Sequence, residues 1–245
     1  MRKENPVEQV LDLCRHGLGA VPEAVWERVD LAVLILADNK LRDLSPLIAR
    51  LQRLHTLDLG HNELTTVPGE LGELGGLTQF LYLHENRLSA LPPALTRLTR
   101  LRYLNVGGNS IAELPDSIGE MAGLIELRAQ HNRLAALPES IGRLGRLREL
   151  WLRGNALAGL PRAVAGLREL RHLDLRENLL TEVPAPLAGL PLLRRIDLRS
   201  NRIRVLPDWL TRMPALEKLD LRWNDIEYAP GLLAALESRG CVVLR

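Results

Sequence analysis

The chain has 245 residues, a formal net charge of +2 and only 3% aromatic residues, whereas 46% of its residues are hydrophobic. A charge so close to zero gives no reason to expect nucleic acid as a partner, and no segment is long and apolar enough to cross a membrane. Since the residues before the first predicted strand do not resemble a secretory signal, we expect a cytoplasmic protein without membrane contact.

One pattern, LxxLxLxxNxLxxLP, recurs along almost the whole chain, and residues 170–184 (LRHLDLRENLLTEVP) are a regular copy of it. The steps between its asparagines are 23 residues except for one of 24. A fixed period of this length indicates a repeat protein, in which units that cannot bury their own apolar faces stack on one another. The asparagines are Asn39, Asn62, Asn86, Asn109, Asn132, Asn155, Asn178, Asn201 and Asn224.

The segment LxL within each copy predicts a short strand with its leucines directed to the core and the residue between them on the opposite face. The asparagine that follows must turn the chain, and its amide can bond backbone groups of its own and neighbouring turns. The pattern resembles leucine-rich repeats, and its second half, LPxxLxxLxxL, resembles the 23-residue cytosolic Ras-group type. This resemblance implies an α/β repeat fold, a right-handed horseshoe-shaped solenoid with a concave parallel sheet and short helices or turns on its convex side.

Residues 1–30 are interpreted as a degenerate repeat that caps the N-terminus. His16 stands at the asparagine position and Arg28 replaces a repeat leucine, as is expected where a terminal repeat meets water. A metal-binding role for His16 lacks a partner at ligand spacing, so we favour the capping interpretation.

Residues 31–236 are the predicted regular repeats, with two local departures. Ser45 and Pro46 shift the proline of the second repeat by one place, which predicts a longer convex helix there. Between Leu77 and Leu81 the chain has three residues instead of two. This insertion predicts a β-bulge, which either re-aims side chains near a binding site or is a neutral insertion.

The C-terminal residues 237–245 are predicted to be a capping strand without an obvious covering helix. Its free edge is a candidate for self-association by strand pairing. With this strand, residues 1–245 form a single leucine-rich repeat domain.

The residues beside the strand leucines project from the predicted concave face. The scarce aromatic residues gather there, and core packing does not explain rings on a solvent face. We therefore predict a partner-binding centre, the alternative being that the rings merely cover the sheet. The candidate binding residues are Phe80, Tyr82, His84, Tyr103, Asn105, Arg128, Trp151, Arg153, Arg176, Arg199 and Arg222.

The last repeats add a ladder of charges to this face. Its aspartates are Asp174, Asp197 and Asp220, flanked on one side by Arg176, Arg199 and Arg222 and on the other by Arg195 and Lys218. One interpretation is a self-compensating, solvated network whose pairs contribute about 0 to 1 kcal/mol each. The alternative is a docking site for an acidic or phosphorylated partner.

No HExxH, GxSxG or kinase motif is present, and no cofactor or metal site is predicted. We predict a non-enzymatic interaction module or scaffold that binds a protein or peptide on its concave face, as the resemblance implies. The alternative is an effector or surface protein, exported without a cleavable signal, that binds a host partner through the same face. Arginine exceeds lysine 29 to 3, which is typical of GC-rich, for example bacterial, genomes.

Overall fold

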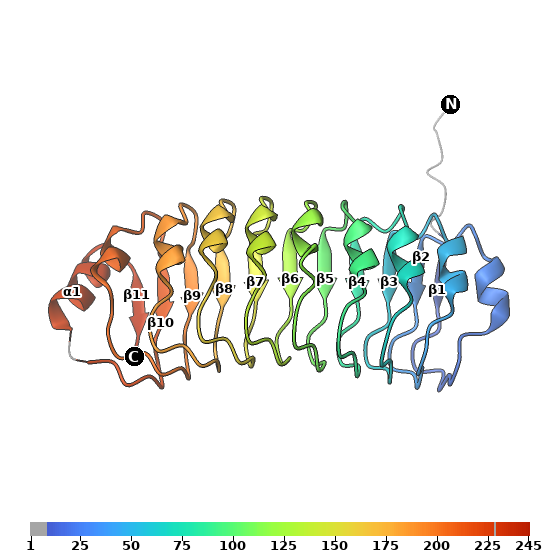
Figure 1. Ribbon diagram of the computed structural model, residues 1–245, viewed down its shortest axis with the longest axis horizontal. Helices are drawn as coiled ribbons and strands as arrows, with labels where there is room; N and C mark the ends of the chain where they lie inside the picture. The colour runs from blue at the N-terminus through green and yellow to red at the C-terminus, as the bar shows by residue number, and fades with distance from the viewer. Residues whose placement is uncertain (1–8, 228) are drawn as a thin grey trace, which may run out of the picture.

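The computed structural model describes residues 9–227 and 229–245, so residues 1–8 of the predicted N-terminal cap lie outside the described residues. Within these ranges, eleven parallel strands form one open sheet in which each strand pairs with the next one along the chain (Figure 1). The strands are β1 (Val10–Asp12), β2 (Val33–Ile35), β3 (Thr56–Asp58), β4 (Phe80–Tyr82), β5 (Tyr103–Asn105), β6 (Glu126–Arg128), β7 (Glu149–Trp151), β8 (His172–Asp174), β9 (Arg195–Asp197), β10 (Lys218–Asp220) and β11 (Val242–Leu244).

Backbone alternation separates the core from the outward face, as β3 illustrates. Leu57 and the following Leu59 are fully buried, whereas Thr56 and Asp58 are half-buried on the other face. Because the leucines of all repeats stack, they form one continuous core. The predicted leucine-rich repeat solenoid is therefore confirmed.

The extra residue of the fourth repeat is absorbed immediately before β4. The N–H groups of Arg102 and Tyr103 donate to the successive carbonyls of Thr78 and Gln79 (3.1 and 3.0 Å), whereas the two equivalent amides of the next repeat share one carbonyl, that of Arg102 (2.8 and 3.2 Å). This irregularity lies where the bulge was predicted. The strand registers on both sides stay intact.

Short 3₁₀ helices cover the side of the sheet opposite the outward face (Figure 1). Proline precedes most of them and holds the chain extended before the first turn, and an apolar side chain such as Ile141 reaches the core from each. They are η1 (Glu23–Glu27), η2 (Pro46–Arg50), η3 (Gly69–Glu73), η4 (Pro93–Arg97), η5 (Ile118–Glu120), η6 (Glu139–Arg143), η7 (Arg162–Gly166), η8 (Ala185–Gly189) and η9 (Asp208–Arg212).

The prediction of a longer helix in the second repeat is wrong. Helix η2 has five residues, like most of the others. Ser45 takes the position that proline holds elsewhere, and its hydroxyl accepts a hydrogen bond from the Leu47 N–H (3.2 Å). The shift of Pro46 is therefore absorbed by a serine cap without a change in length.

The repeated asparagines form the predicted ladder, as Asn132 shows. Its Nδ2 lies 2.9 Å from the carbonyl oxygen of Val106, 3.2 Å from that of Ala129 and 3.3 Å from that of Gln130, and its Oδ1 accepts from the Ile111 N–H (2.9 Å). The same set of contacts recurs at each repeat asparagine through residue 201. Each asparagine thus joins its own turn to the preceding repeat.

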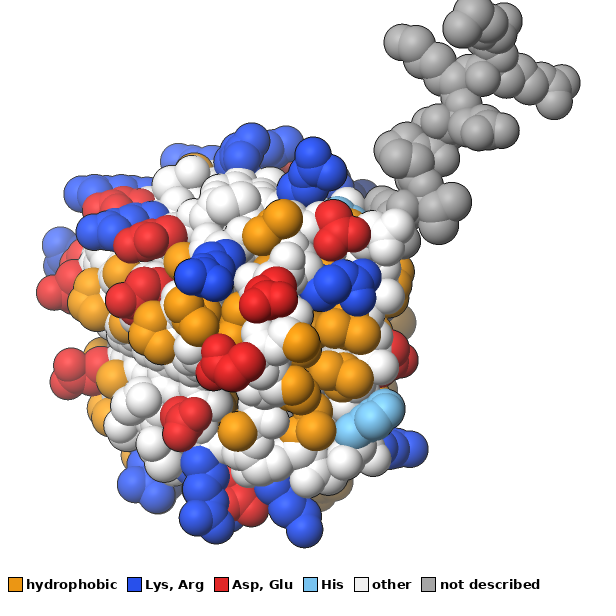
Figure 2. All heavy atoms as spheres, turned by 90° about the vertical axis from the view of Figure 1, so that its right-hand side faces the viewer, with side chains coloured by type: hydrophobic (Ala, Val, Ile, Leu, Met, Phe, Trp, Pro, Cys, Tyr) orange, Lys and Arg blue, Asp and Glu red, His pale blue; other side chains and the backbone are white. Residues whose placement is uncertain are grey.

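The N-terminal end has the mixed surface of a cap. Figure 2 faces this end and shows hydrophobic side chains interspersed with charged ones. Trp26 of η1 is buried beneath it, whereas Val10 and Val29 are exposed. His16 is exposed and its Nδ1 lies 2.9 Å from the carbonyl oxygen of Cys14, a local turn contact that fits the capping interpretation.

The C-terminal end differs from the prediction, because a helix does cover it. Helix α1 (Pro230–Ser238) packs against both η9 and β11 and buries Leu233 and Leu236. Strand β11 nevertheless ends the sheet, so its pairing with another chain stays a prediction, as do the cap boundaries at residues 30 and 236. Among the described residues, no helix is long and apolar enough to span a membrane.

Candidate functional site

Four rings form what we call the aromatic patch: Phe80, Tyr82, Tyr103 and Trp151. Their strands run from β4 to β7, and their side chains alternate with the buried leucines, so they point away from the core. The ring centroids of Tyr82 and Tyr103 are 5.0 Å apart, and Phe80 lies 6.0 Å from Tyr82 and 5.6 Å from Tyr103. These are contact distances for aromatic pairs, so three of the four rings make one surface.

Arg128, on β6, connects this trio to Trp151. Its guanidinium carbon lies 5.8 Å from the Tyr103 ring and 5.1 Å from the Trp151 ring, within the range of cation–π attraction. Glu126 holds it in place from the same strand, with 2.5 Å between Nε and Oε1. The patch is therefore continuous across four strands, with a fixed charge at its centre.

Burial within this cluster affects the chemistry of its phenols. Desolvation raises the pKa of Tyr103 to about 12, against the opposing influence of Arg128. Desolvation also raises the pKa of Tyr82. Both hydroxyls therefore stay protonated at neutral pH and can donate hydrogen bonds to a partner.

Histidines extend both ends of the aromatic patch. His84 lies 5.9 Å from Tyr82 and 4.9 Å from His61, and His172 lies 4.4 Å from Trp151. Burial lowers the pKa of both His84 and His172, which favours neutral rings at physiological pH. His61 and His172 were not among the predicted binding residues, although His172 begins its strand at the same position as Tyr103.

A glycine beneath His84 explains its position. A Cβ added at Gly60 would lie 2.3 Å from the imidazole Cε1, so the ring occupies space that only glycine leaves free. The same arrangement places Gln130 over Gly107. Glycine in one repeat thus lets the next repeat lay its side chain flat on the sheet.

Asn105 has a structural contact instead of an outward one. It is buried, and its Oδ1 accepts from the Gly107 N–H (3.0 Å). Asp58 makes the equivalent bond to Gly60, and Asp174 to Arg176. Each of these short acceptors is the last residue of its strand and caps the strand end. Asn105 therefore presents little surface to a partner.

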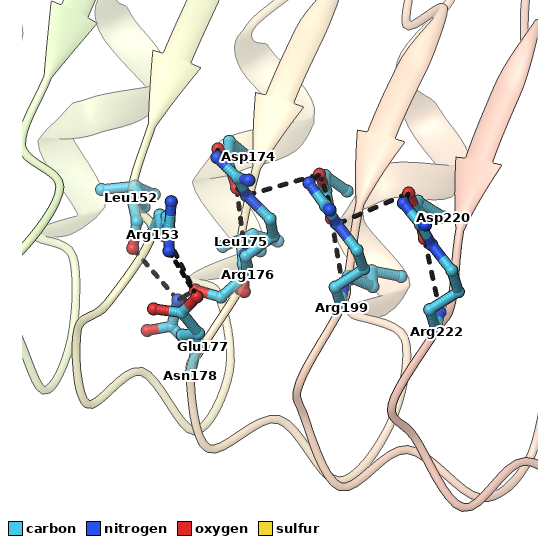
Figure 3. Close-up of polar contacts among 12 residues, drawn as sticks. Leu152, Arg153, Asp174, Leu175, Arg176, Glu177, Asn178, Arg199, Asp220 and Arg222 are labelled. Atoms are coloured by element: carbon cyan, nitrogen blue, oxygen red, sulfur yellow. Dashed lines mark hydrogen bonds and ion pairs between the residues drawn. The ribbon is translucent and has the colours of Figure 1, made fainter. Parts of the chain in front are cut away.

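The charge ladder is a chain of ion pairs (Figure 3). Each arginine binds the aspartate two residues before it, at 2.7, 2.7 and 2.8 Å. Arg176 and Arg199 also lie 3.4 Å from the aspartate of the next strand. Nearby, Arg153 binds Glu177 at 2.7 Å. This geometry favours the self-compensating network over the docking site.

The aspartates at both ends of the ladder are buried, whereas a solvated ladder was predicted. The side chains of Asp174 and Asp220 are only 2% and 3% exposed. Desolvation works against the charge of Asp220, but hydrogen bonds from Arg222 and the charge of Arg199 together hold its pKa below the usual value. The prediction of a solvated network is therefore wrong for Asp174 and Asp220. Because a buried carboxylate needs a cation nearby, we expect the loss of an arginine to cost more than it would at an exposed pair.

We expect Arg199→Gln to lower the free energy of unfolding at pH 7 by about 1 to 3 kcal/mol, because two aspartates lose a partner. A carboxylate whose pKa is depressed on folding stabilises the protein above its unfolded pKa, and that stability is lost as pH falls through the folded value. The penalty should therefore shrink on acidification from pH 7 to pH 3, measured by urea unfolding. Arg202→Gln, at an exposed site outside the ladder, is the control; an equal, pH-independent loss in both variants contradicts the prediction.

Family profiles for the leucine rich repeat match residues 29–88, 122–180 and 180–226, and a further one matches residues 100–121. Since these matches cover most of the chain, it belongs to the leucine-rich repeat family. The Ras-group subtype stays a prediction. No curated protein matches the chain significantly.

Solved structures of similar fold include a leucine-rich repeat protein of Leptospira interrogans, with 25% identity and a TM-score of 0.70 over 96% of this chain and 76% of that one. Another is the plant peptide hormone receptor RGFR1 in complex with RGF2, with 26% identity and a TM-score of 0.71 over 91% of this chain and 41% of that one. A third is the ectodomain of the receptor kinase GASSHO1/SCHENGEN3 from Arabidopsis thaliana in complex with CASPARIAN STRIP INTEGRITY FACTOR 2. It has 26% identity and a TM-score of 0.69 over 92% of this chain and 31% of that one. The chain spans less than half of either plant receptor chain.

Proposed function

We propose that this protein is an interaction module that binds a peptide or protein segment across the aromatic patch on its concave face. The observation that most directly supports this proposal is the unbroken series of ring and guanidinium contacts from Tyr82 to Trp151. Rings on a rigid sheet lose little entropy on binding and remove a large area from water. Two of the similar structures are receptor complexes with their ligands, which supports a partner of this kind.

We expect each of Tyr82→Ala, Tyr103→Ala and Trp151→Ala to weaken partner binding by about 2 kcal/mol or more, because central aromatic residues dominate interfaces. The partner is first captured with the purified chain from its own lysate, identified and purified, and its affinity is then measured by calorimetry. The melting temperature should change little, since these side chains point away from the leucine core.

A matched control replaces exposed residues of the convex side, Arg143→Ala and Arg168→Ala together, and should bind like wild type. If the triple aromatic variant retains full affinity while a variant of the convex side or of β11 loses it, the proposed site is wrong.

A further inference from the structure

The extra residue before β4 coincides with a groove at the edge where the chain passes from the 3₁₀ helices into the strands. This groove has a volume of about 710 Å³, and its lining includes Thr78, Thr99 and Ala122. Two of its lining residues are joined by a hydrogen bond, in which the Gly123 N–H donates to the Thr99 carbonyl (2.8 Å). A Cβ at Gly123 would lie 2.7 Å from the backbone of Arg100, so glycine is needed for this close approach.

The groove continues into the aromatic patch. A smaller hollow of about 190 Å³, lined by Phe80 and Tyr103, shares Gln79, Arg102 and Ile125 with the groove. A peptide lying on the rings can therefore pass over the edge of the sheet into the groove without leaving the surface.

The described residues that line this groove include three arginines and no acidic residue. Arg100, Arg102 and Arg146 line it and are exposed. In the part of the chain that the structure describes, neither Arg102 nor Arg146 forms an ion pair, whereas Arg148 pairs with Glu169 (3.5 Å) and the ladder arginines have their aspartates. The Glu126 carboxylate at the rim is bound to Arg128 and does not neutralise them.

We propose that this basic groove binds acidic side chains of a peptide whose neighbouring apolar residue packs on Phe80 and Tyr103. Guanidinium groups bind carboxylates through paired, charge-assisted hydrogen bonds. Ala122 and Ile125 supply apolar wall for the methylene groups of glutamate. Three arginines gather in a groove that adjoins the aromatic surface, which fits a short segment that carries both acidic and apolar side chains. This inference rests on the proposed function and specifies the chemistry of its partner.

The test uses a library of synthetic peptides in which one tryptophan is followed, one to five residues later, by two glutamates. Matched libraries carry glutamine or phosphoserine in place of glutamate. Binding to the full chain is measured by fluorescence polarisation at low and high salt. We expect the glutamate library to bind about tenfold more tightly than the glutamine library at low salt, with the preference shrinking as salt rises.

The variant Arg102→Gln with Arg146→Gln should lose this preference while keeping its melting temperature, because both side chains are exposed. Arg133→Gln with Arg202→Gln makes the same change in charge at exposed sites elsewhere and should keep the preference. The inference is overturned if glutamate and glutamine peptides bind alike, if no peptide binds, or if the groove variant keeps the preference. A stronger preference for phosphoserine overturns the assignment to carboxylates.

The variant Tyr82→Ala with Tyr103→Ala separates this inference from the proposed function. Loss of binding to the glutamate and glutamine libraries alike supports both. If this variant still binds glutamate peptides fully and the groove variant does not, the aromatic site fails and the basic groove stands.

Discussion

Replacing Asn132 by alanine is expected to lower the free energy of unfolding by about 1 to 3 kcal/mol. The amide oxygen receives the N–H of Ile111, and the amide nitrogen lies 2.9 Å from the carbonyl oxygen of Val106; both residues are fully buried. Alanine leaves the Ile111 N–H without a partner, at a cost of about 1 to 3 kcal/mol, whereas the Val106 carbonyl still accepts from the Asn109 amide (3.0 Å). Urea unfolding followed by circular dichroism measures the loss.

Two comparisons make this result specific. Arg133→Ala changes the exposed neighbour and should alter stability by less than about 0.5 kcal/mol. His16→Ala changes the equivalent position of the N-terminal cap, which is exposed, and should cost less than Asn132→Ala. If all three variants unfold alike, the asparagine ladder does not hold the repeats together.

The leucine core and the asparagine ladder were predictable because both follow from short-range geometry. Alternation fixes the direction of Leu57 and Leu59 within a single strand, and the contacts of Asn132 repeat at a constant spacing. The same alternation places Phe80 and Tyr82 on the face opposite the buried Leu81, as predicted. Because the same strand register repeats in every unit, tertiary contacts have little freedom to change the direction of these side chains.

Helix α1 was missed although its signal is in the sequence. Proline at Pro230 begins the helix, and Leu233 and Leu236 are spaced three residues apart on its buried side. The repeat pattern had led us to expect a strand alone, since it carries no information about the segment that ends the array. The terminal unit is shaped by the need to cover the last core residues, which differs from the need of an internal repeat.

The direction of long side chains was the least predictable part of the site. The strand alternation predicted Arg176 and Arg199 on the outward face, but an arginine side chain can reach either a binding partner or a neighbouring residue. Asp174 and Asp220 are buried, and a buried carboxylate requires a cation. These arginines therefore bind the neighbouring aspartates. Arg102 and Arg146 lie outside the strands, and their groove depends on backbone geometry before β4 that spacing alone does not reveal.

Gly142 should be a second position of large effect, because the stacking of η6 on η7 requires it. A Cβ at Gly142 would lie 2.2 Å from the carbonyl oxygen of Ala163 and 2.9 Å from its Cβ. A backbone oxygen cannot turn aside as a flexible side chain can, so the two repeats must separate. Overpacking of this kind costs about 1 to 3 kcal/mol, and we expect Gly142→Ala near the upper end and Gly142→Val beyond it.

Gly145 provides the matched control, since it lies three residues further on and its added Cβ would meet nothing within 4 Å. Gly145→Ala should be neutral or stabilise by up to about 1 kcal/mol through the unfolded chain. Because an array is stabilised by contacts between nearest neighbours, weakening the contact between η6 and η7 should also uncouple the two halves. Urea unfolding of Gly142→Val should then show a smaller m-value or two transitions. If the substitutions at the two glycines gave equal stability and equal cooperativity, the stacked 3₁₀ helices would have to adapt to the added side chain. The coupling between repeats would then reside in the sheet and the asparagine ladder alone.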